Sequence, residues 1–158
     1  MKWGDVDFET GIWGIETEPG EKGNPGSIRL PQVALDIIAA QPALVGNPYV
    51  FATGRSRKKK HGHFHASSKR KEALDAKLPK DMANWTIHDL RRTARSLMAR
   101  IGILDQVGER VLGHKQGGVL GIYNRHHYQN EVADALALLA GEIDRILKPG
   151  SKVVALRG

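Results

Sequence analysis

One predicted helix carries an imidazole and two guanidinium groups along the border of its apolar face. In the run TIHDLRRTARSLMARIG, the residues His88, Arg91 and Arg95 recur at spacings of three and four. At about 100° per residue, the three side chains lie within roughly 60° of one another. A guanidinium at such a half-desolvated border interacts strongly with an anion. The same spacing also fits three exposed polar residues on an ordinary amphipathic helix.

A histidine and a tyrosine further along the chain form a second pair that could do chemistry. His114 follows Gly113 in LGHKQGG, and Tyr123 lies nine residues later in GIYNRHHY. A tyrosine hydroxyl, with an ordinary pKa of about 10, becomes a nucleophile when cations stabilise its phenolate and the phosphate that it attacks. The alternative interpretation takes Tyr123 as a half-buried aromatic residue and His114 as a polar residue at a helix end.

Taken in order, these residues resemble the tyrosine recombinases, and more narrowly the phage and prophage integrases. The matching elements are H-x-x-R at residues 88–91, L-G-H at 112–114, and the tyrosine nine residues after that histidine. The similarity extends upstream: MKWGDVDFETGIW resembles the first strands of the family's catalytic domain, and EKGNPGSIRLP its lysine-bearing hairpin. PYVFATG is similar to the segment after the following helix, so the resemblance covers nearly the whole chain.

The resemblance implies a catalytic role for each of five residues. Tyr123 would attack the scissile DNA phosphate and form a 3′-phosphotyrosyl bond. Arg91 would bind the non-bridging oxygens, whose charge grows in the transition state. His88 would hydrogen-bond the phosphate or assist proton transfer, His114 would donate a hydrogen bond to it, and Lys22 would protonate the leaving 5′ oxygen. No metal or other cofactor is expected, since these cations stabilise the charge that Mg²⁺ stabilises in other phosphoryl transfers.

The chain departs from the family pattern at the second arginine of the phosphate pocket. The family carries it in a T-G-x-R-x-x-E segment before the first strand, and no such segment occurs in the 158 residues. The similar start at Thr53, Gly54 and Arg55 continues as S-R-K. We therefore expect a C-terminal fragment of an integrase, over residues 1–148 with a tail at 149–158, that is inactive or weakly active alone.

Three alternatives compete with this interpretation. Tyr128 is a second candidate nucleophile, but it lies fourteen residues after His114, beyond the family spacing. Two helices broken at Gly102 in a basic chain favour a non-catalytic helix-turn-helix module that binds DNA. The second of these helices, over 105–112, is short and contains two carboxylates. An RNA-binding domain would need aromatic residues clustered on strands, and aromatics make up only 6% of the chain.

A basic stretch without acidic residues covers residues 51–71. The whole chain carries a net charge of +7, which favours an anionic partner, and we expect double-stranded DNA. A mobile, solvated charge run is the alternative. Within the stretch, HGHFH at 61–65 has no nearby carboxylate, so we expect no metal site there. The predicted DNA contacts are Arg55, Arg57, Lys58, Lys59, Lys60, Lys69, Arg70, Lys71 and, on the histidine-bearing helix, Arg95.

The composition and hydropathy of the chain are those expected of an intracellular protein. It is 41% hydrophobic and 26% charged, typical of a globular domain, and it contains no cysteine, which excludes a disulfide scaffold and a thiolate nucleophile. No apolar run reaches the roughly 18 residues that a membrane-spanning helix needs, and the N-terminus does not resemble a signal peptide. We expect a cytoplasmic protein that does not associate with membranes.

The predicted elements give an α+β fold that is mainly α-helical. Residues 3–30 favour a small antiparallel sheet with a tight tip at 19–26, and residues 31–148 are mainly helical. A short helix starts at Pro31, with Val33, Ile37 and Ile38 among its apolar positions. Helices follow over 86–101, 105–112 and 130–147, with capping by Thr86 and Asp89 at the first of them and by Gly113 after the second. The last helix is expected to pack on its own domain or on a neighbouring protomer. The predicted buried positions of these three helices include Leu90, Leu97, Met98, Leu104, Val107, Val132, Leu139, Ile143 and Leu147.

Overall fold

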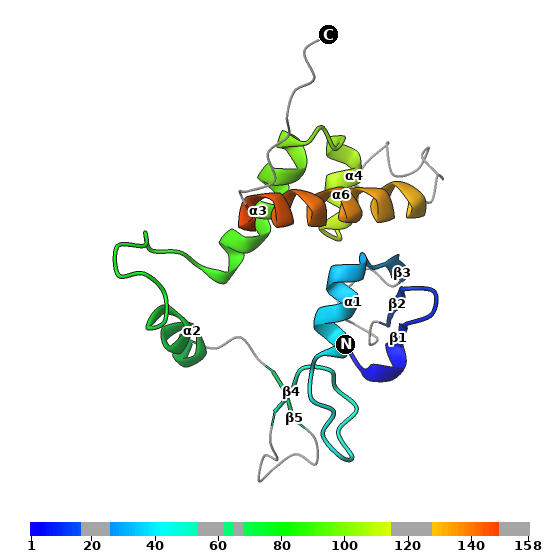
Figure 1. The fold of residues 1–158 in the computed structure, drawn as a ribbon. Helices are drawn as coiled ribbons and strands as arrows, with labels where there is room; N and C mark the ends of the chain where they lie inside the picture. The colour runs from blue at the N-terminus through cyan, green and yellow to red at the C-terminus, as the bar shows by residue number, and fades with distance from the viewer. Residues whose placement is uncertain (17–25, 54–61, 65–67, 115–127, 149–158) are drawn as a thin grey trace.

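A three-stranded antiparallel sheet opens the chain, as the sequence predicts. The computed structural model describes residues 1–16, 26–53, 62–64, 68–114 and 128–148 (Figure 1). After the short 3₁₀ helix η1 (Trp3–Asp5), the strands β1 (Val6–Asp7), β2 (Ile12–Ile15) and β3 (Gly26–Arg29) pair in the order β1-β2-β3. In the tight turn between β1 and β2, the Asp7 carboxylate accepts hydrogen bonds from the backbone of Glu9 and Thr10. The predicted hairpin tip lies mostly outside the described residues.

The helix α1 (Gln32–Ala39) follows the sheet and starts after Pro31, as predicted. Its buried residues are Leu35 and Ile38, whereas Val33 and Ile37 are 50% and 55% exposed. The predicted apolar face was therefore wrong at these two positions. The helix is only eight residues long, and it buries one i, i+3 pair rather than a full stripe.

The basic stretch contains regular structure that the sequence pattern does not predict. The strands β4 (Ala52–Thr53) and β5 (Gly62–His63) pair antiparallel, and the Asn47 side chain donates a hydrogen bond to the Gly62 carbonyl at 2.9 Å. The helix α2 (Ser68–Asp75) begins inside the basic stretch, where the sequence analysis names no helix. Lys71 pairs with Asp75 one turn later at 2.6 Å. No residue of α2 is buried, and its sequence lacks the repeating apolar positions that predict a helix.

Three helices in the second half of the chain match the predicted ones: α3 (Ile87–Arg100), α4 (Asp105–Val111) and α6 (Gln129–Leu147). At the start of α3, the Asp89 carboxylate accepts hydrogen bonds from the backbone N–H and the hydroxyl of Thr86, both at 2.8 Å. The same hydrogen bonds lower the pKa of Asp89 below its ordinary value. The predicted cap is therefore present.

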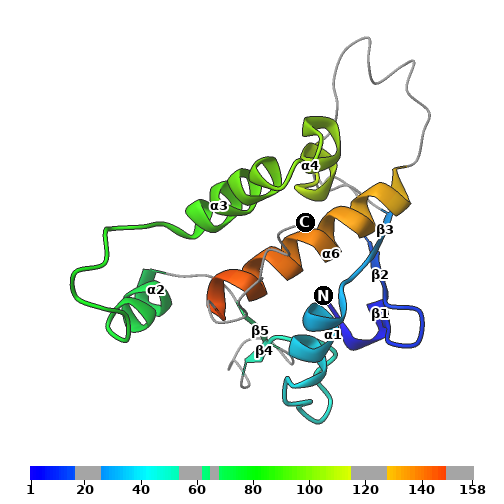
Figure 2. The same cartoon turned by 45° about the horizontal axis from the view of Figure 1, so that its top comes forward.

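The long helix α6 forms the centre of the packing. It contacts α3, α4 and β3, and Figure 2 shows it running between the α3–α4 pair and the N-terminal sheet. A core cluster joins Val107 of α4 to Val132 and Ala135 of α6. Met98 of α3 is fully buried. This arrangement, with small antiparallel sheets beside packed helices, agrees with a coarse α+β class.

Several positions predicted to be buried are exposed at the ends of these helices. Exposure is 59% for Leu90 and 64% for Leu104, and on α6 it is 41% for Ile143 and 72% for Leu147. Leu90 belongs to the first turn of α3, which extends past the end of α6 in Figure 1. Within the described residues, no helix is both long and apolar enough to cross a membrane.

Candidate active site

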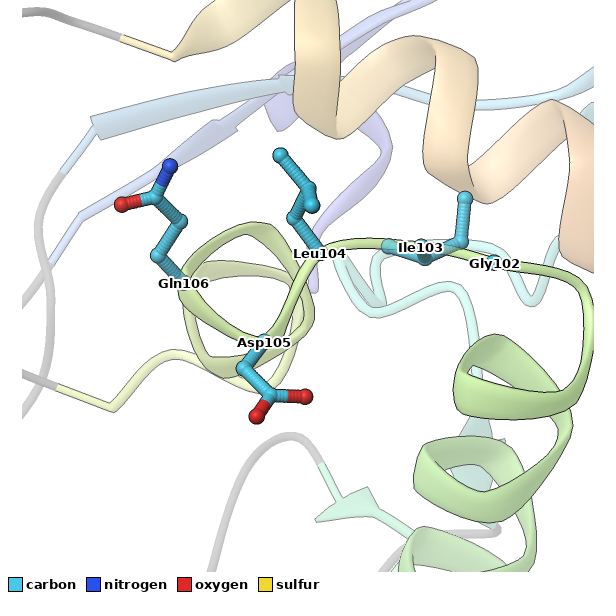
Figure 3. A pocket seen from close by; sticks show the side chains of 5 residues that line it. All are labelled: Gly102, Ile103, Leu104, Asp105 and Gln106. Carbon is cyan, nitrogen blue, oxygen red and sulfur yellow. The ribbon is translucent and has the colours of Figure 1, made fainter.

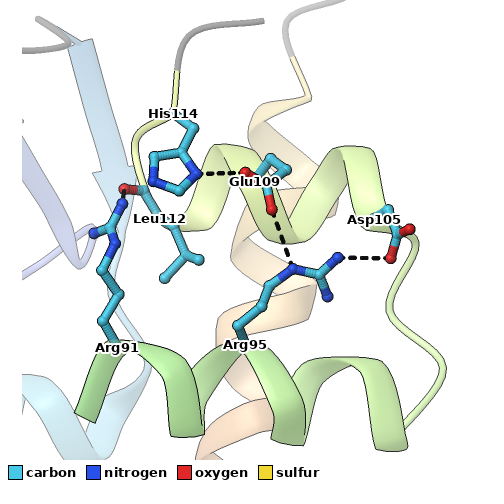
Figure 4. Close-up of polar contacts among 6 residues, drawn as sticks. All are labelled: Arg91, Arg95, Asp105, Glu109, Leu112 and His114. Atoms are coloured by element: carbon cyan, nitrogen blue, oxygen red, sulfur yellow. Dashed lines mark hydrogen bonds and ion pairs between the residues drawn. The ribbon is translucent and has the colours of Figure 1, made fainter. Parts of the chain in front are cut away.

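Two arginines of α3 reach across to α4 (Figure 4). Arg91 donates from Nη2 to the backbone carbonyl of Leu112, at the C-terminal end of α4. Helix C-termini leave carbonyls without partners inside the helix, and a cation there is also favoured by the helix dipole. Because a guanidinium has five N–H donors, this bond leaves most of the donors of Arg91 available for another acceptor.

The L-G-H sequence ends α4 in a Schellman motif. Gly113 adopts a left-handed conformation with φ of 71°, and its N–H donates to the carbonyl of Arg110 at 2.9 Å. The N–H of His114 donates to the carbonyl of Glu109, also at 2.9 Å. These are the two hydrogen bonds that define the motif. The backbone of His114 is thus fixed to the last turn of α4, as the predicted glycine cap requires.

A carboxylate that the sequence analysis did not single out as a site residue contacts the His114 ring. Oε2 of Glu109 is hydrogen-bonded to Nδ1 of His114, and Oε1 accepts from Nε of Arg95 at 3.1 Å. The hydrogen bonds from His114 and then from Arg95 hold the pKa of Glu109 below its ordinary value. An ionised carboxylate only accepts hydrogen bonds, so Nδ1 of His114 is the donor.

Arg95, a predicted DNA contact, is engaged by two carboxylates in the structure. Besides Glu109, it binds Asp105, with 2.6 Å between Nη2 and Oδ1. Both hydrogen bonds raise the pKa of Arg95 above its ordinary value. The buried Gly108 lies on the same side of α4, where a side-chain carbon would stand 3.5 Å from the Arg95 guanidinium. That distance is an ordinary van der Waals contact, so Arg95 lies directly against α4 at this position.

The structure brings two of the five predicted catalytic residues to one place. Arg91 binds the carbonyl two residues before His114, although the two are far apart in the sequence. His88 lies one turn before Arg91 on α3 and is exposed. Tyr123 and Lys22 lie outside the described residues, so their roles stay predictions.

Tyr128, the alternative nucleophile, has a packing role. It is half-buried against the core cluster defined above, and the Arg110 guanidinium lies 4.1 Å from its ring centroid. The residue precedes α6 with φ of 30°, a left-handed conformation that is uncommon for a bulky side chain. Its surroundings are those of a residue that fixes the start of α6.

Besides Arg95, three of the predicted DNA contacts are described, and these three lie on α2, away from α4 (Figure 1). Lys71 lies 4.1 Å from the ring centroid of Trp85, and Arg70 lies 4.5 Å from that of Phe64. Lys69 is exposed on the same helix. The other predicted contacts of the basic stretch, at 55 and 57–60, lie outside the described residues.

A surface hollow lies at the opposite end of α4 from His114. It is lined by residues 102–106, and Figure 3 shows the side chains of Leu104, Asp105 and Gln106 around it. Of the predicted catalytic residues that the structure describes, none lines this hollow. We therefore place the candidate site at the C-terminal end of α4, where Arg91 and His114 meet.

Comparison with known proteins gives one family for the chain. The model of the phage integrase family matches residues 1–130, which is most of the chain and includes every predicted catalytic residue. No curated protein and no solved structure gives a match. With H-x-x-R and L-G-H in one matched segment and their arginine and histidine side by side in the fold, the chain belongs to the phage integrase family, a family of tyrosine recombinases.

Proposed function

We propose that the chain breaks and rejoins DNA strands during the integration or excision of a mobile element such as a prophage. The observation that carries the proposal is the convergence of Arg91 and His114 on the last turn of α4. Two donors of this kind at one helix end suit a phosphate whose negative charge grows in the transition state. Membership of the family supports the same reaction.

In the proposed step, the hydroxyl oxygen of Tyr123 attacks the scissile phosphorus. A phosphorus–oxygen bond forms to the tyrosine, and the bond to the 5′ oxygen breaks. Lys22 donates a proton to that leaving oxygen, while His88 hydrogen-bonds the phosphate or takes the tyrosine proton. The reverse attack by a 5′ hydroxyl rejoins the strands and releases the tyrosine. One phosphodiester replaces another, so the step needs no cofactor.

The planar fork of Arg91 is suited to the non-bridging oxygens of this phosphate. One N–H is committed to the carbonyl of Leu112, which fixes the plane of the guanidinium. The remaining donors can bind two oxygens at once, which a lysine cannot do. The pocket of the family contains a second arginine, carried in a T-G-x-R-x-x-E segment. The 158 residues contain no such segment, so we expect the pocket formed by this chain to lack that arginine. The chain alone is then expected to cleave weakly.

The basic stretch supplies the proposed contacts to the DNA backbone. Such contacts raise affinity without reading the sequence, so they do not identify an attachment site. The proposed contacts are Arg55, Arg57, Lys58, Lys59, Lys60, Lys69, Arg70 and Lys71.

α6 supplies the proposed surface for self-association, because Leu138 and Leu147 are 56% and 72% exposed. Sedimentation across a range of concentrations tests this point, and a monomer at every concentration would contradict self-association of the chain alone.

Covalent trapping tests the proposed reaction. Nicked duplexes tiled across the DNA on both sides of the coding gene are incubated with the chain and resolved on a denaturing gel. A second protein joins the chain at Met1 to a segment that carries the family's T-G-x-R-x-x-E arginine. Tyr123→Phe removes the proposed nucleophile, and Tyr128→Phe is the matched control because it removes the same hydroxyl from the packed tyrosine.

We expect a protein–DNA adduct that Tyr123→Phe abolishes and Tyr128→Phe leaves in place. The joined protein should form more adduct than the chain alone. An adduct that survives Tyr123→Phe would contradict the assignment of the nucleophile. Salt-sensitive DNA binding with no adduct from either protein would instead favour the helix-turn-helix alternative, a module that binds DNA without cutting it.

A further inference from the structure

The side chain of Glu109 joins His114 to Arg95 at the candidate site (Figure 4). One carboxylate oxygen accepts from each partner, so both oxygens are occupied. The His114 side chain is 51% exposed and the Glu109 side chain 37% exposed. A half-exposed imidazole without a partner rotates freely about its side-chain bonds and exchanges its proton between the two ring nitrogens.

The contact with Glu109 fixes which nitrogen of His114 faces the candidate phosphate position. With Nδ1–H held by the carboxylate, Nε2 is the nitrogen that remains for another ligand. Figure 4 shows that second ring nitrogen on the side of the ring where the Arg91 guanidinium lies. In the doubly protonated ring both nitrogens donate, so Nε2–H can bind a phosphate oxygen while Nδ1–H stays on Glu109.

Arg95 makes a carboxylate tolerable so close to a DNA phosphate. An isolated carboxylate beside the phosphate would repel it, because like charges at short range raise the free energy of the complex. The Arg95 guanidinium lies 3.1 Å from Glu109 and offsets part of its charge, while Asp105, at 2.6 Å from the same guanidinium, is 88% exposed and its own charge is screened by water. Arg95 and Glu109 lie fourteen residues apart on two helices, so the pair also sets the approach of α3 to α4.

We propose that Glu109 is a positioning residue of the recombinase, which orients the His114 imidazole so that Nε2 faces the scissile phosphate, and that Arg95 holds Glu109 in place. The inference rests on the proposed function for the role of His114, but the contact itself can be measured without DNA. A carboxylate that accepts a hydrogen bond from one ring nitrogen orients the histidine in the same way in metal sites and in hydrolase triads.

Nitrogen-15 NMR of the His114 ring in the free chain tests the orientation. At a pH where the ring is neutral, we expect Nδ1 to carry the proton in the wild type. Glu109→Gln has nearly the same shape, but an amide has one accepting oxygen where the carboxylate has two. With that oxygen on Arg95, the amide N–H₂ faces His114, and we expect the proton to move to Nε2. In Glu109→Ala we expect signals of a ring that averages both forms.

Cleavage kinetics test the consequence. Glu109→Ala should slow adduct formation by roughly tenfold to a hundredfold, the range expected from a small misplacement of a catalytic group. In a His114→Ala background, Glu109→Ala should change the rate less than twofold, because the group that it orients is gone. Asp144→Asn is the control for charge, since it removes an exposed carboxylate of α6 that pairs with Lys148.

The outcomes separate the contact from the catalytic role. Ring signals that are the same in wild type, Glu109→Gln and Glu109→Ala would overturn the proposal, whatever the kinetics show. Additive losses in the His114→Ala background would also overturn it and would assign Glu109 to folding alone. If the ring signals shift as expected but neither the wild-type chain nor the joined protein forms an adduct, the proposed function fails and the positioning role in catalysis falls with it.

Discussion

Replacing Gly113 with alanine should damage the site through the backbone alone. Gly113 has φ of 71°, and a residue with a β-carbon loses roughly 1–2 kcal/mol in this left-handed conformation. Gly102 provides a matched control on the same chain, because it ends α3 with φ of 81° and the same pair of hydrogen bonds. A β-carbon at Gly102 would meet no atom within 4 Å, so only the strain is added there.

Both variants should therefore lose roughly 1–2 kcal/mol of unfolding free energy in urea titrations, or about 2–4 °C of melting temperature per kcal/mol. Only Gly113→Ala displaces His114, whose N–H is fixed by the motif that Gly113 closes. Measured below both melting temperatures, adduct formation should fall at least tenfold in Gly113→Ala and stay close to wild type in Gly102→Ala. Gly113→Asn should recover part of the loss, since asparagine tolerates the left-handed region. Equal rates in the two alanine variants would refute the argument that this turn positions His114.

Three further predictions concern stability and DNA binding. Hydrogen bonds from Arg145 and Arg100 lower the pKa of Glu142 from 4.5 to about 2, so its stabilising effect is fully present above pH 4.5 and is lost as the pH falls towards 2. The difference in urea midpoint between wild type and Glu142→Gln should be largest at neutral pH and should disappear as the pH falls from 4.5 to about 2. A difference that does not change with pH would contradict this role of the ionised Glu142. Met98→Ala should cost about 2–5 kcal/mol of unfolding free energy, because Met98 is fully buried, and a loss below about 1 kcal/mol would show that the core closes around the gap. Replacing Lys58, Lys59 and Lys60 with glutamine should flatten the plot of log affinity for DNA against log salt by about 0.9 for each lysine that contacts a phosphate, whereas an unchanged slope would remove them from the interface.

Among the helices that the sequence predicts correctly, α3 and α4 have both an apolar period and explicit ends, whereas α6 was predicted from its apolar period alone. Thr86 and Asp89 mark the start of α3, and Gly102 and Gly113 mark the ends of α3 and α4. α2 has neither signal. Its polar sequence is stabilised instead by local contacts such as the ion pair of Lys71 with Asp75. The exposed Leu90 shows a further limit: periodicity gives the apolar face of a helix, but not how far its neighbours extend along it.

The candidate site was predictable to a similar extent. The spacing of H-x-x-R places Arg91 and His88 on one side of a helix, and the structure agrees with that placement. The partners of these residues come from tertiary contacts that no spacing encodes, such as Arg91 on the Leu112 carbonyl. Glu109 had one local signal, because it precedes His114 by five residues across a glycine-capped helix end. A Schellman motif brings residues at that separation together, so the L-G-H pattern could have indicated it.

The short helix α4 connects the site to the core. Its last turn holds Arg91 and His114, while Val107 in its first half packs against Val132 and Ala135 of α6. A seven-residue helix is too short to be stable in isolation, so its position depends on that packing. We therefore expect the proposed reaction to depend on α6 even where α6 contacts no substrate. A partner that binds the exposed side of α6 would then act on the same element that positions the candidate site residues.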